Sequence, residues 1–204
     1  STIVKQTKRS EKEVDIKPLI YACDCRLSVY PIEPQMEVTI KNTCYTVGSL
    51  LRDERLAEHF KDGYLWVFRL SVDDYHRYIY VDNGRESVRR RIPGVLHTVN
   101  PVANDVCPIY KENTREYSLL KSEHFGTLLM MEVGALMVGK IENRPVMSHV
   151  RRGQEKGNFA FGGSTIIYMT QKDKVFPDMD ILINSADGIE TKVQIGSRIG
   201  KGKN

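Results

Sequence analysis

Cysteine is scarce in this chain, which excludes the small disulfide-stapled folds. Only four cysteines occur in 204 residues, and the sole close pair is a C-x-C at Cys23 and Cys25. A structural zinc site would need a second pair, and neither Cys44 nor Cys107 supplies one. We therefore expect reduced thiols in a cytoplasmic protein, with no bound metal.

Long apolar runs are missing as well. No segment approaches the roughly 20 consecutive apolar residues that a spanning helix requires, and no secretory signal is recognisable. The first residue is Ser1 rather than methionine. We expect from this that an N-terminal membrane-docking extension is missing.

The chain also lacks a strong net charge, since its formal charge is only +4. Basic residues gather at 89–91, at 151–152 and in the C-terminal SRIGKGKN, with no interleaved aromatic residues. Nucleic-acid binders usually combine such clusters with aromatics on one element, so we expect no nucleic-acid partner. The clusters are typical of a solvated surface, and attraction to anionic lipid is the alternative interpretation.

Short strand-like segments are what the sequence has in quantity. Apolar, aromatic and β-branched residues alternate or cluster over strand-like lengths between turn residues. These segments are 26–32, 37–47, 64–72, 78–81, 116–122, 126–141 and 158–169. Residues 47–63 are the best helix candidate, with Ser49 as the cap and Gly63 as the end.

Composition and pattern together predict one β-rich α+β domain. A hydrophobic fraction of 41% is enough for a single core, and no linker, low-complexity segment or repeat divides the chain. We expect barrel-sandwich-like antiparallel sheets with few helices, over residues 1–204.

One strand-like segment, NFAFGGSTIIYM at 158–169, is interrupted by two glycines before Ser164. Taken alone, it favours a glycine bulge beside an inert serine. The other interpretation is an N-to-O shift, in which the Ser164 hydroxyl attacks the preceding carbonyl and converts the peptide bond to an ester. That reaction needs a distortable backbone, which Gly163 permits, together with a base and oxyanion donors.

The base would have to come from a distant part of the chain. Of five histidines, His76, His97 and His124 lie in polar surroundings next to strand or turn segments, where sites are often built. Asp73 and Asp74 are adjacent, so in a strand only one of them faces inward and could orient a histidine. Spacing alone does not show that a serine, a histidine and an aspartate meet.

Six blocks in a fixed order resemble the phosphatidylserine decarboxylase family. They cover nearly the whole chain, from about residue 20 to residue 200. The blocks are DDYHRYIYVDNG (73–84), PGVLHTVNPVA (93–103), YKENTREYSLL (110–120), EHFGTLLMMEVGALMVGKI (123–141), RRGQEKGNFAFGGST (151–165) and ETKVQIGSRIG (190–200). One departure is Cys25, which stands where the family usually has a glycine.

The resemblance implies self-cleavage between Gly163 and Ser164. The products would be a β chain of residues 1–163 and an α chain of residues 164–204, the latter beginning with a pyruvoyl group made from Ser164. In this alignment of blocks, Asp74 and His124 act with Ser164 in the cut. His76 and His97 are expected near the substrate.

The resemblance also implies the reaction and the partners. Phosphatidylserine in a membrane would be decarboxylated to phosphatidylethanolamine and CO₂. The pyruvoyl ketone would act as the electron sink, without a metal or a diffusible cofactor. We expect a homodimer of cleaved chains, bound peripherally to the cytoplasmic face of a bacterial membrane.

Two alternatives differ in substrate and in class. A decarboxylase-like relative could act on a soluble amino acid such as tryptophan. A lipid substrate instead predicts an apolar surface for interfacial binding, for which residues 50–60 and 89–91 are the candidates. The non-enzymatic alternative is a barrel-sandwich carrier of the lipoyl or biotinyl type, which would need a modifiable lysine at a hairpin tip that the sequence lacks.

Overall fold

Most elements of the protein are β-strands. The computed structural model describes residues 4–6, 18–20, 25–71, 77–97, 110–134, 140–160 and 164–203. The elements in chain order are β1 (Val4–Gln6), β2 (Pro18–Ile20), β3 (Cys25–Pro31), β4 (Glu37–Ile40), β5 (Thr43–Thr46), α1 (Val47–Leu51), α2 (Glu54–Glu58), β6 (Tyr64–Leu70), β7 (Arg77–Ile79), β8 (Gly84–Glu86), β9 (Arg90–Ile92), β10 (Val95–His97), β11 (Tyr110–Glu112), β12 (Arg115–Ser122), β13 (Thr127–Val133), β14 (Lys140–Asn143), β15 (Glu155–Ala160), β16 (Ser164–Thr170), β17 (Val175–Pro177), α3 (Met179–Ala186), β18 (Glu190–Val193) and β19 (Arg198–Gly202). The predicted β-rich α+β class is confirmed.

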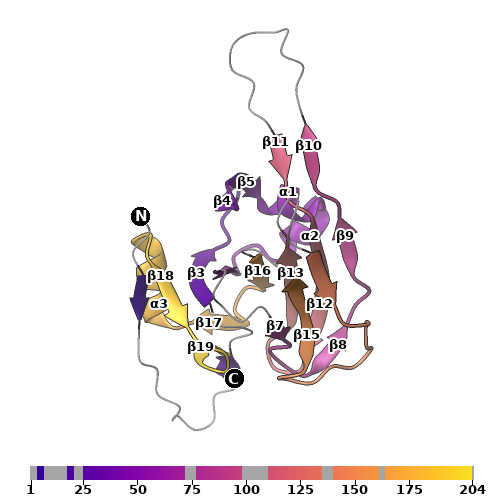
Figure 1. The fold of residues 1–204 in the computed structure, drawn as a ribbon. Coiled ribbons are helices and arrows are strands. Elements are labelled where there is room, and N and C mark those ends of the chain that lie inside the picture. Colours follow the sequence, from indigo (N-terminus) through magenta and orange to yellow (C-terminus); the bar gives the residue numbers. More distant parts are fainter. Residues whose placement is uncertain are drawn as a thin grey trace.

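A nine-stranded sheet forms the body of the molecule (Figure 1). Its order is β1-β18-β3-β6-β16-β13-β12-β8, and β9 also pairs with β12. Four smaller sheets accompany it: β14-β15-β7, β17-β19-β2, β4-β5 and β10-β11. Among the described strands every pairing is antiparallel except β1 with β18, so short turns and crossovers suffice to connect them.

Strand β16 lies in the middle of the large sheet, and all seven of its residues are buried. Alternate side chains enter two cores. Ile166 and Tyr168 belong to the first, and Ile167 and Met169 to the second. The first core is covered by β7, β15 and α3, and the second by α1 and the β4-β5 hairpin. Because both faces are covered, the middle of the strand, residues 166–169, is an unbroken apolar run instead of an alternating one.

The segment expected to be one helix forms two short ones. Thr46 caps α1, and Ser49 completes a reciprocal capping box as the third helical residue, so Ser49 is not the cap that the sequence suggested. Arg52 then adopts a left-handed conformation with φ 49°, which ends α1. Asp53 caps α2 by accepting a hydrogen bond from the Leu56 backbone N–H. A second strong cap inside the segment therefore divides it.

Helix α3 occupies a region where only strands and turns were expected. Asp178 follows Pro177 immediately before it, and Gly188 follows it with φ 70°. These are ordinary start and stop signals, so the sequence did contain the evidence for this helix. The hairpin predicted at Lys41 and Asn42 is confirmed, since both residues have the positive φ of a tight two-residue turn.

Besides the connection from β7 to β8, three connections join the nine-stranded sheet to the β14-β15-β7 sheet. They run from β6 to β7, from β13 to β14 and from β15 to β16 through residues 72–76, 135–139 and 161–163, which lie outside the described residues. The strand order matches in the two sheets, because β6-β16-β13 in one corresponds to β7-β15-β14 in the other. The described ends of all three connections are therefore brought together at one end of β16.

Candidate functional site

Ser164 is the first residue of β16 and lies at this meeting point. Its relative exposure is 1%, and it pairs with Leu70 of β6. The next residue, Thr165, pairs with Val133 of β13. The serine therefore occupies the buried start of a central strand that is held on both edges.

Three of the predicted site residues, Gly163, Asp74 and His76, lie outside the described residues. The residues that flank them are described. Leu70, just before the segment with Asp74 and His76, pairs with Ser164. Arg77, just after that segment, pairs with Asn158 of β15. The described residues on either side of 72–76 therefore pair with β15 and β16, the two strands that flank 161–163.

His124 lies in the turn between β12 and β13, where a buried aspartate fixes it. Its Nδ1 atom is 2.9 Å from Oδ1 of Asp82, and its backbone N–H donates to Oδ2 of Asp82 at 3.0 Å. The Ser122 hydroxyl donates to the same Oδ2 atom. Asp82 is only 1% exposed, and this carboxylate thus sets the orientation of the imidazole ring and ties the turn together.

The structure does not bring His124 to Ser164. The backbone N–H of Thr127, at the start of β13, donates a hydrogen bond to Oε1 of Gln171 at 2.9 Å, whereas Val133, at the end of β13, pairs with Thr165. A strand rises about 3.3 Å per residue, so the seven steps from residue 164 to residue 171 span about 23 Å. The antiparallel register therefore puts His124 and Ser164 at opposite ends of the sheet, and the expected contact between them is not formed.

His97 ends β10, which among the described strands pairs with β11 alone, in a two-stranded sheet. Figure 1 shows this hairpin projecting from the body of the molecule. Its backbone position is described and its side chain is not. Its expected role near the substrate remains a prediction.

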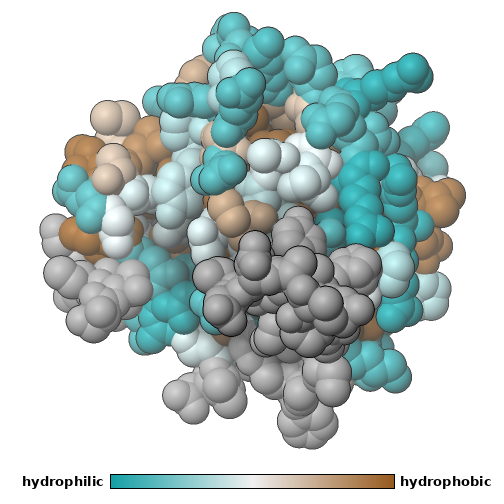
Figure 2. All heavy atoms as spheres, turned by 90° about the horizontal axis from the view of Figure 1, so that it is seen from above, coloured by the Kyte–Doolittle hydropathy of each residue, from teal (hydrophilic) through white to brown (hydrophobic). Residues whose placement is uncertain are grey.

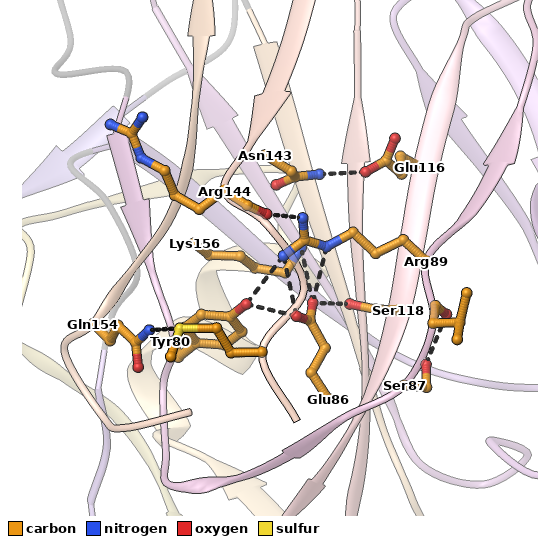
Figure 3. A network of polar contacts seen from close by, with 12 residues as sticks. Tyr80, Glu86, Ser87, Arg89, Glu116, Ser118, Asn143, Arg144, Gln154 and Lys156 are labelled. Atoms are coloured by element: carbon orange, nitrogen blue, oxygen red, sulfur yellow. Dashed lines mark hydrogen bonds and ion pairs between the residues drawn. The ribbon is translucent and has the colours of Figure 1, made fainter. Parts of the chain in front are cut away.

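Four buried ionisable side chains, Glu86, Arg89, Glu132 and Lys156, form what we call the ionic cluster (Figure 3). Lys156 Nζ lies 2.6 Å from Glu132 Oε1 and 3.8 Å from Glu86 Oε1. Arg89 donates to both oxygens of Glu86, at 3.1 and 3.0 Å. Two cations thus face two carboxylates, and the formal charges cancel.

Neutral groups satisfy the remaining oxygens of the cluster. The Asn143 amide nitrogen donates to Glu132 Oε2 at 3.0 Å and to Glu116 Oε1 at 2.7 Å. The Tyr78 hydroxyl donates to the side-chain amide oxygen, Oδ1, of Asn143 at 2.9 Å. On the other side, the hydroxyls of Ser118 and Tyr80 donate to Glu86, each at 2.7 Å. Such a buried network is rigid because few of its polar groups lack a partner.

Burial and pairing act differently on the two carboxylates. Burial raises the pKa of Glu132, against the opposing effect of Lys156 and Asn143. Burial acts in the same direction on Glu86, but the Arg89 hydrogen bonds and the Lys156 charge outweigh it and lower the pKa of Glu86. Glu86 is therefore the firmly ionised member, and the charge of Glu132 depends on its lysine partner.

The sequence reading missed this cluster. Glu132 stands alone within the apolar run LLMMEVGALM, and a lone carboxylate in a buried strand requires a partner. That was a usable signal. Its partner Lys156 could not be identified from spacing, because the contact depends on how two sheets pack. Arg89 was read as part of an exposed basic run, whereas its side chain is only 9% exposed.

In the segments expected to contact lipid, the exposed residues are mostly charged, and the large apolar ones mostly face the core. Leu50, Leu51 and Phe60 have no exposed surface, and Arg89 belongs to the ionic cluster. Other hydrophobic residues reach the surface instead, mainly on two sides of the molecule separated by hydrophilic residues (Figure 2). The large exposed ones in the described part of the chain are Val88, Val146, Met147, Met179, Ile183 and Ile195. No helix in that part is long and apolar enough to cross a membrane.

Comparison with known proteins shows extensive similarity. The family model for phosphatidylserine decarboxylase matches residues 2–201. Phosphatidylserine decarboxylase proenzyme 2 of Clostridium acetobutylicum is 47% identical over 183 residues, which is 90% of this chain and 62% of that protein. The proenzymes of Clostridium tetani and of Clostridium botulinum strain Alaska E43 are 44% and 42% identical, over 80% and 89% of this chain and 56% and 62% of their own lengths. The chain thus spans about three fifths of the curated relatives it matches.

Proposed function

The chain belongs to the phosphatidylserine decarboxylase family, and on this premise we propose that it cuts itself at Gly163–Ser164 and decarboxylates phosphatidylserine. The observation that carries the proposal is the position of Ser164. It is buried at the start of the central strand, directly after the connection that would be cut. The relatives are described as proenzymes, which agrees with a precursor that must be processed.

The chain's own residues support the chemistry of the cut. The Ser164 hydroxyl attacks the carbonyl carbon of Gly163, and the amide nitrogen of Ser164 leaves as the ester forms. Removal of the Cα proton of residue 164 then eliminates residue 163 as a carboxylate and leaves dehydroalanine at 164. Dehydroalanine tautomerises to an imine, and water hydrolyses the imine to the pyruvoyl ketone with release of ammonia. Glycine at 163 lets the backbone adopt the distorted geometry that the attack needs.

The surroundings of Ser164 fit a pyruvoyl group. The residue has almost no solvent contact, and the nearest strand partners on its own face, Leu70 and Ile166, are apolar. A small uncharged ketone can be buried there at a much lower cost in free energy than a charged group. When formed, it would supply an electron sink for decarboxylation of an amine-bearing substrate.

Cleavage at this position leaves the α chain bound. Strand β16 would start at the new terminus, and it remains paired with β6 through seven residue pairs and with β13 through five. The α chain also contains α3, whose Ile181 lies in the first core. The two chains would therefore stay together without a covalent bond.

We assign the base for the cut to the segment with Asp74 and His76. Its described flanks lie beside the flanks of Gly163, whereas His124 lies about 23 Å along the sheet from Ser164. His76 thus takes the role that the family resemblance implied for His124, and Asp74 keeps its role as the group that orients the histidine. The Asp82 contact gives His124 a structural role in its turn.

A membrane lipid is the substrate that the surface favours. Val88 is 86% exposed and Met147 is 52% exposed. Arg89, next to Val88, donates to the backbone oxygen of Arg144, which places the two exposed apolar segments close together. Apolar side chains among arginines suit the surface of an anionic bilayer, so we propose peripheral binding there. We also propose that the cleaved protein forms a homodimer.

Self-cleavage is tested by the intact mass of the purified protein. The wild type is expected to give two masses, for residues 1–163 and 164–204, with the smaller fragment blocked to amine-reactive sequencing. The two should elute together in native size exclusion and separate only in denaturant. Ser164→Ala should give one uncut mass with the same fold. A wild-type chain that stays whole when supplied with lipid would contradict the proposal.

The assignment of the base is tested by two matched histidine variants. His76→Ala should leave the chain uncut, because the Ser164 hydroxyl loses its base. His124→Ala should cut at a rate within about twofold of wild type and lose about 1.5 to 3 kcal/mol of stability, because the Asp82 carboxylate loses a hydrogen bond. Both are measured by gel time course and thermal melting. The reverse pattern, with only His124→Ala uncut, would restore His124 to the catalytic role.

Lipid and soluble substrates are separated by direct assay. Cut wild-type protein should release CO₂ from phosphatidylserine in mixed micelles and form phosphatidylethanolamine. Free serine and free tryptophan should react at least a hundredfold more slowly at equal concentration. Ser164→Ala is the blank. Faster turnover of a free amino acid would favour the soluble-substrate alternative.

A further inference from the structure

The two strands that meet at the proposed cut are both anchored to the same place on β13. Downstream of the cut, Thr165 of β16 pairs with Val133. Upstream of it, Lys156 of β15 reaches Glu132 with a separation of 2.6 Å. Adjacent residues of one strand thus hold both sides of the peptide bond that would be broken.

The upstream anchor crosses between two sheets. Strand β15 pairs with β14 and β7, and none of its described backbone pairings is with the nine-stranded sheet. The Lys156 side chain links β15 to β13 of the nine-stranded sheet, a link that the described backbone hydrogen bonds do not provide. Both charged groups are fully buried, and a buried pair of this kind has little freedom to move.

We propose that the Glu132–Lys156 ion pair is a positioning clamp for self-cleavage, a role that rests on the function proposed above. It fixes β15 against β13 and so restricts the approach of the Gly163 carbonyl to the Ser164 hydroxyl. Neither residue takes part in bond making. After the cut, the same pair keeps the end of the β chain beside residue 164.

The register supports a local role. Glu132 pairs with Ile166, and Ser164 lies two residues further along β16 on the same face. Such diagonal neighbours are about 7 to 8 Å apart. The Glu86–Arg89 pair is different, because its members are three residues apart on one segment and β8 lies three strands from β16. Glu86 also lies 3.8 Å from Lys156, but the 2.6 Å contact between Lys156 and Glu132 remains when Glu86 and Arg89 are replaced, so these two supply a matched control of similar burial.

The clamp is tested by replacing both charges together. Glu132→Leu with Lys156→Met removes the link without leaving a buried charge unpaired, a change that often preserves folding. Cell-free synthesis with a gel time course should show self-cleavage slowed by at least tenfold, with a melting temperature close to that of the uncut Ser164→Ala protein. Glu86→Leu with Arg89→Met should cut at the wild-type rate below its melting temperature. A wild-type rate in the first double variant would overturn the clamp.

Conservative variants keep the test decisive if the double variant misfolds. Glu132→Asp retains both charges and shortens the reach of the carboxylate by one methylene, so cutting should slow while the fold persists. Lys156→Arg keeps a long cationic reach and should cut faster than Lys156→Met. Once cut, Glu132→Asp should show a wild-type KM for phosphatidylserine. Equal slowing by the Glu86 and Arg89 control would show general loosening instead of a clamp, and an uncut wild type would refute the proposed function separately.

Discussion

The pairing of β16 on both edges is the constraint on which the rest of the structure depends. Strands β6 and β13 hold it along its length, and its side chains contribute to both cores. A cut at its first residue would remove one covalent bond and leave the ladders and the packing in place. A chain cut at this buried position would therefore keep its fold.

The second constraint is that three connections cross between two sheets at the same end of β16. Because the order β6-β16-β13 corresponds to β7-β15-β14, these crossings run between matching strands. Backbone ladders cannot continue through such a change of sheet, so side chains have to fix the geometry there. The ionic cluster lies between the two sheets, with Glu132 on one and Lys156 on the other. Because two cations face two carboxylates, their mutual attraction offsets the cost of removing these charges from water.

Local sequence signals predicted most of the longer strands, the β-rich class and the hairpin at Lys41 and Asn42, because periodicity and turn residues act over a few positions. The segment 126–141, expected as one strand, forms two strands, β13 and β14, in different sheets. The family resemblance located Ser164. What failed depends on register and packing between distant segments. His124 and Ser164 are separated by the antiparallel register of β13 and β16, and no spacing rule contains that register. The Lys156–Glu132 contact was hidden for the same reason, although Glu132 in an apolar run was a visible warning.

The most direct test of the central claim is hydrogen exchange in β16 before and after the cut. The account predicts that peptides covering residues 164–170 are among the most protected in uncut Ser164→Ala protein and keep that protection in cut wild-type protein. Both ladders persist in that case, and only the first amide should exchange faster. Exchange throughout 164–170 at the rate of an unfolded chain after cleavage would contradict it, because β16 would then depend on the bond that was broken.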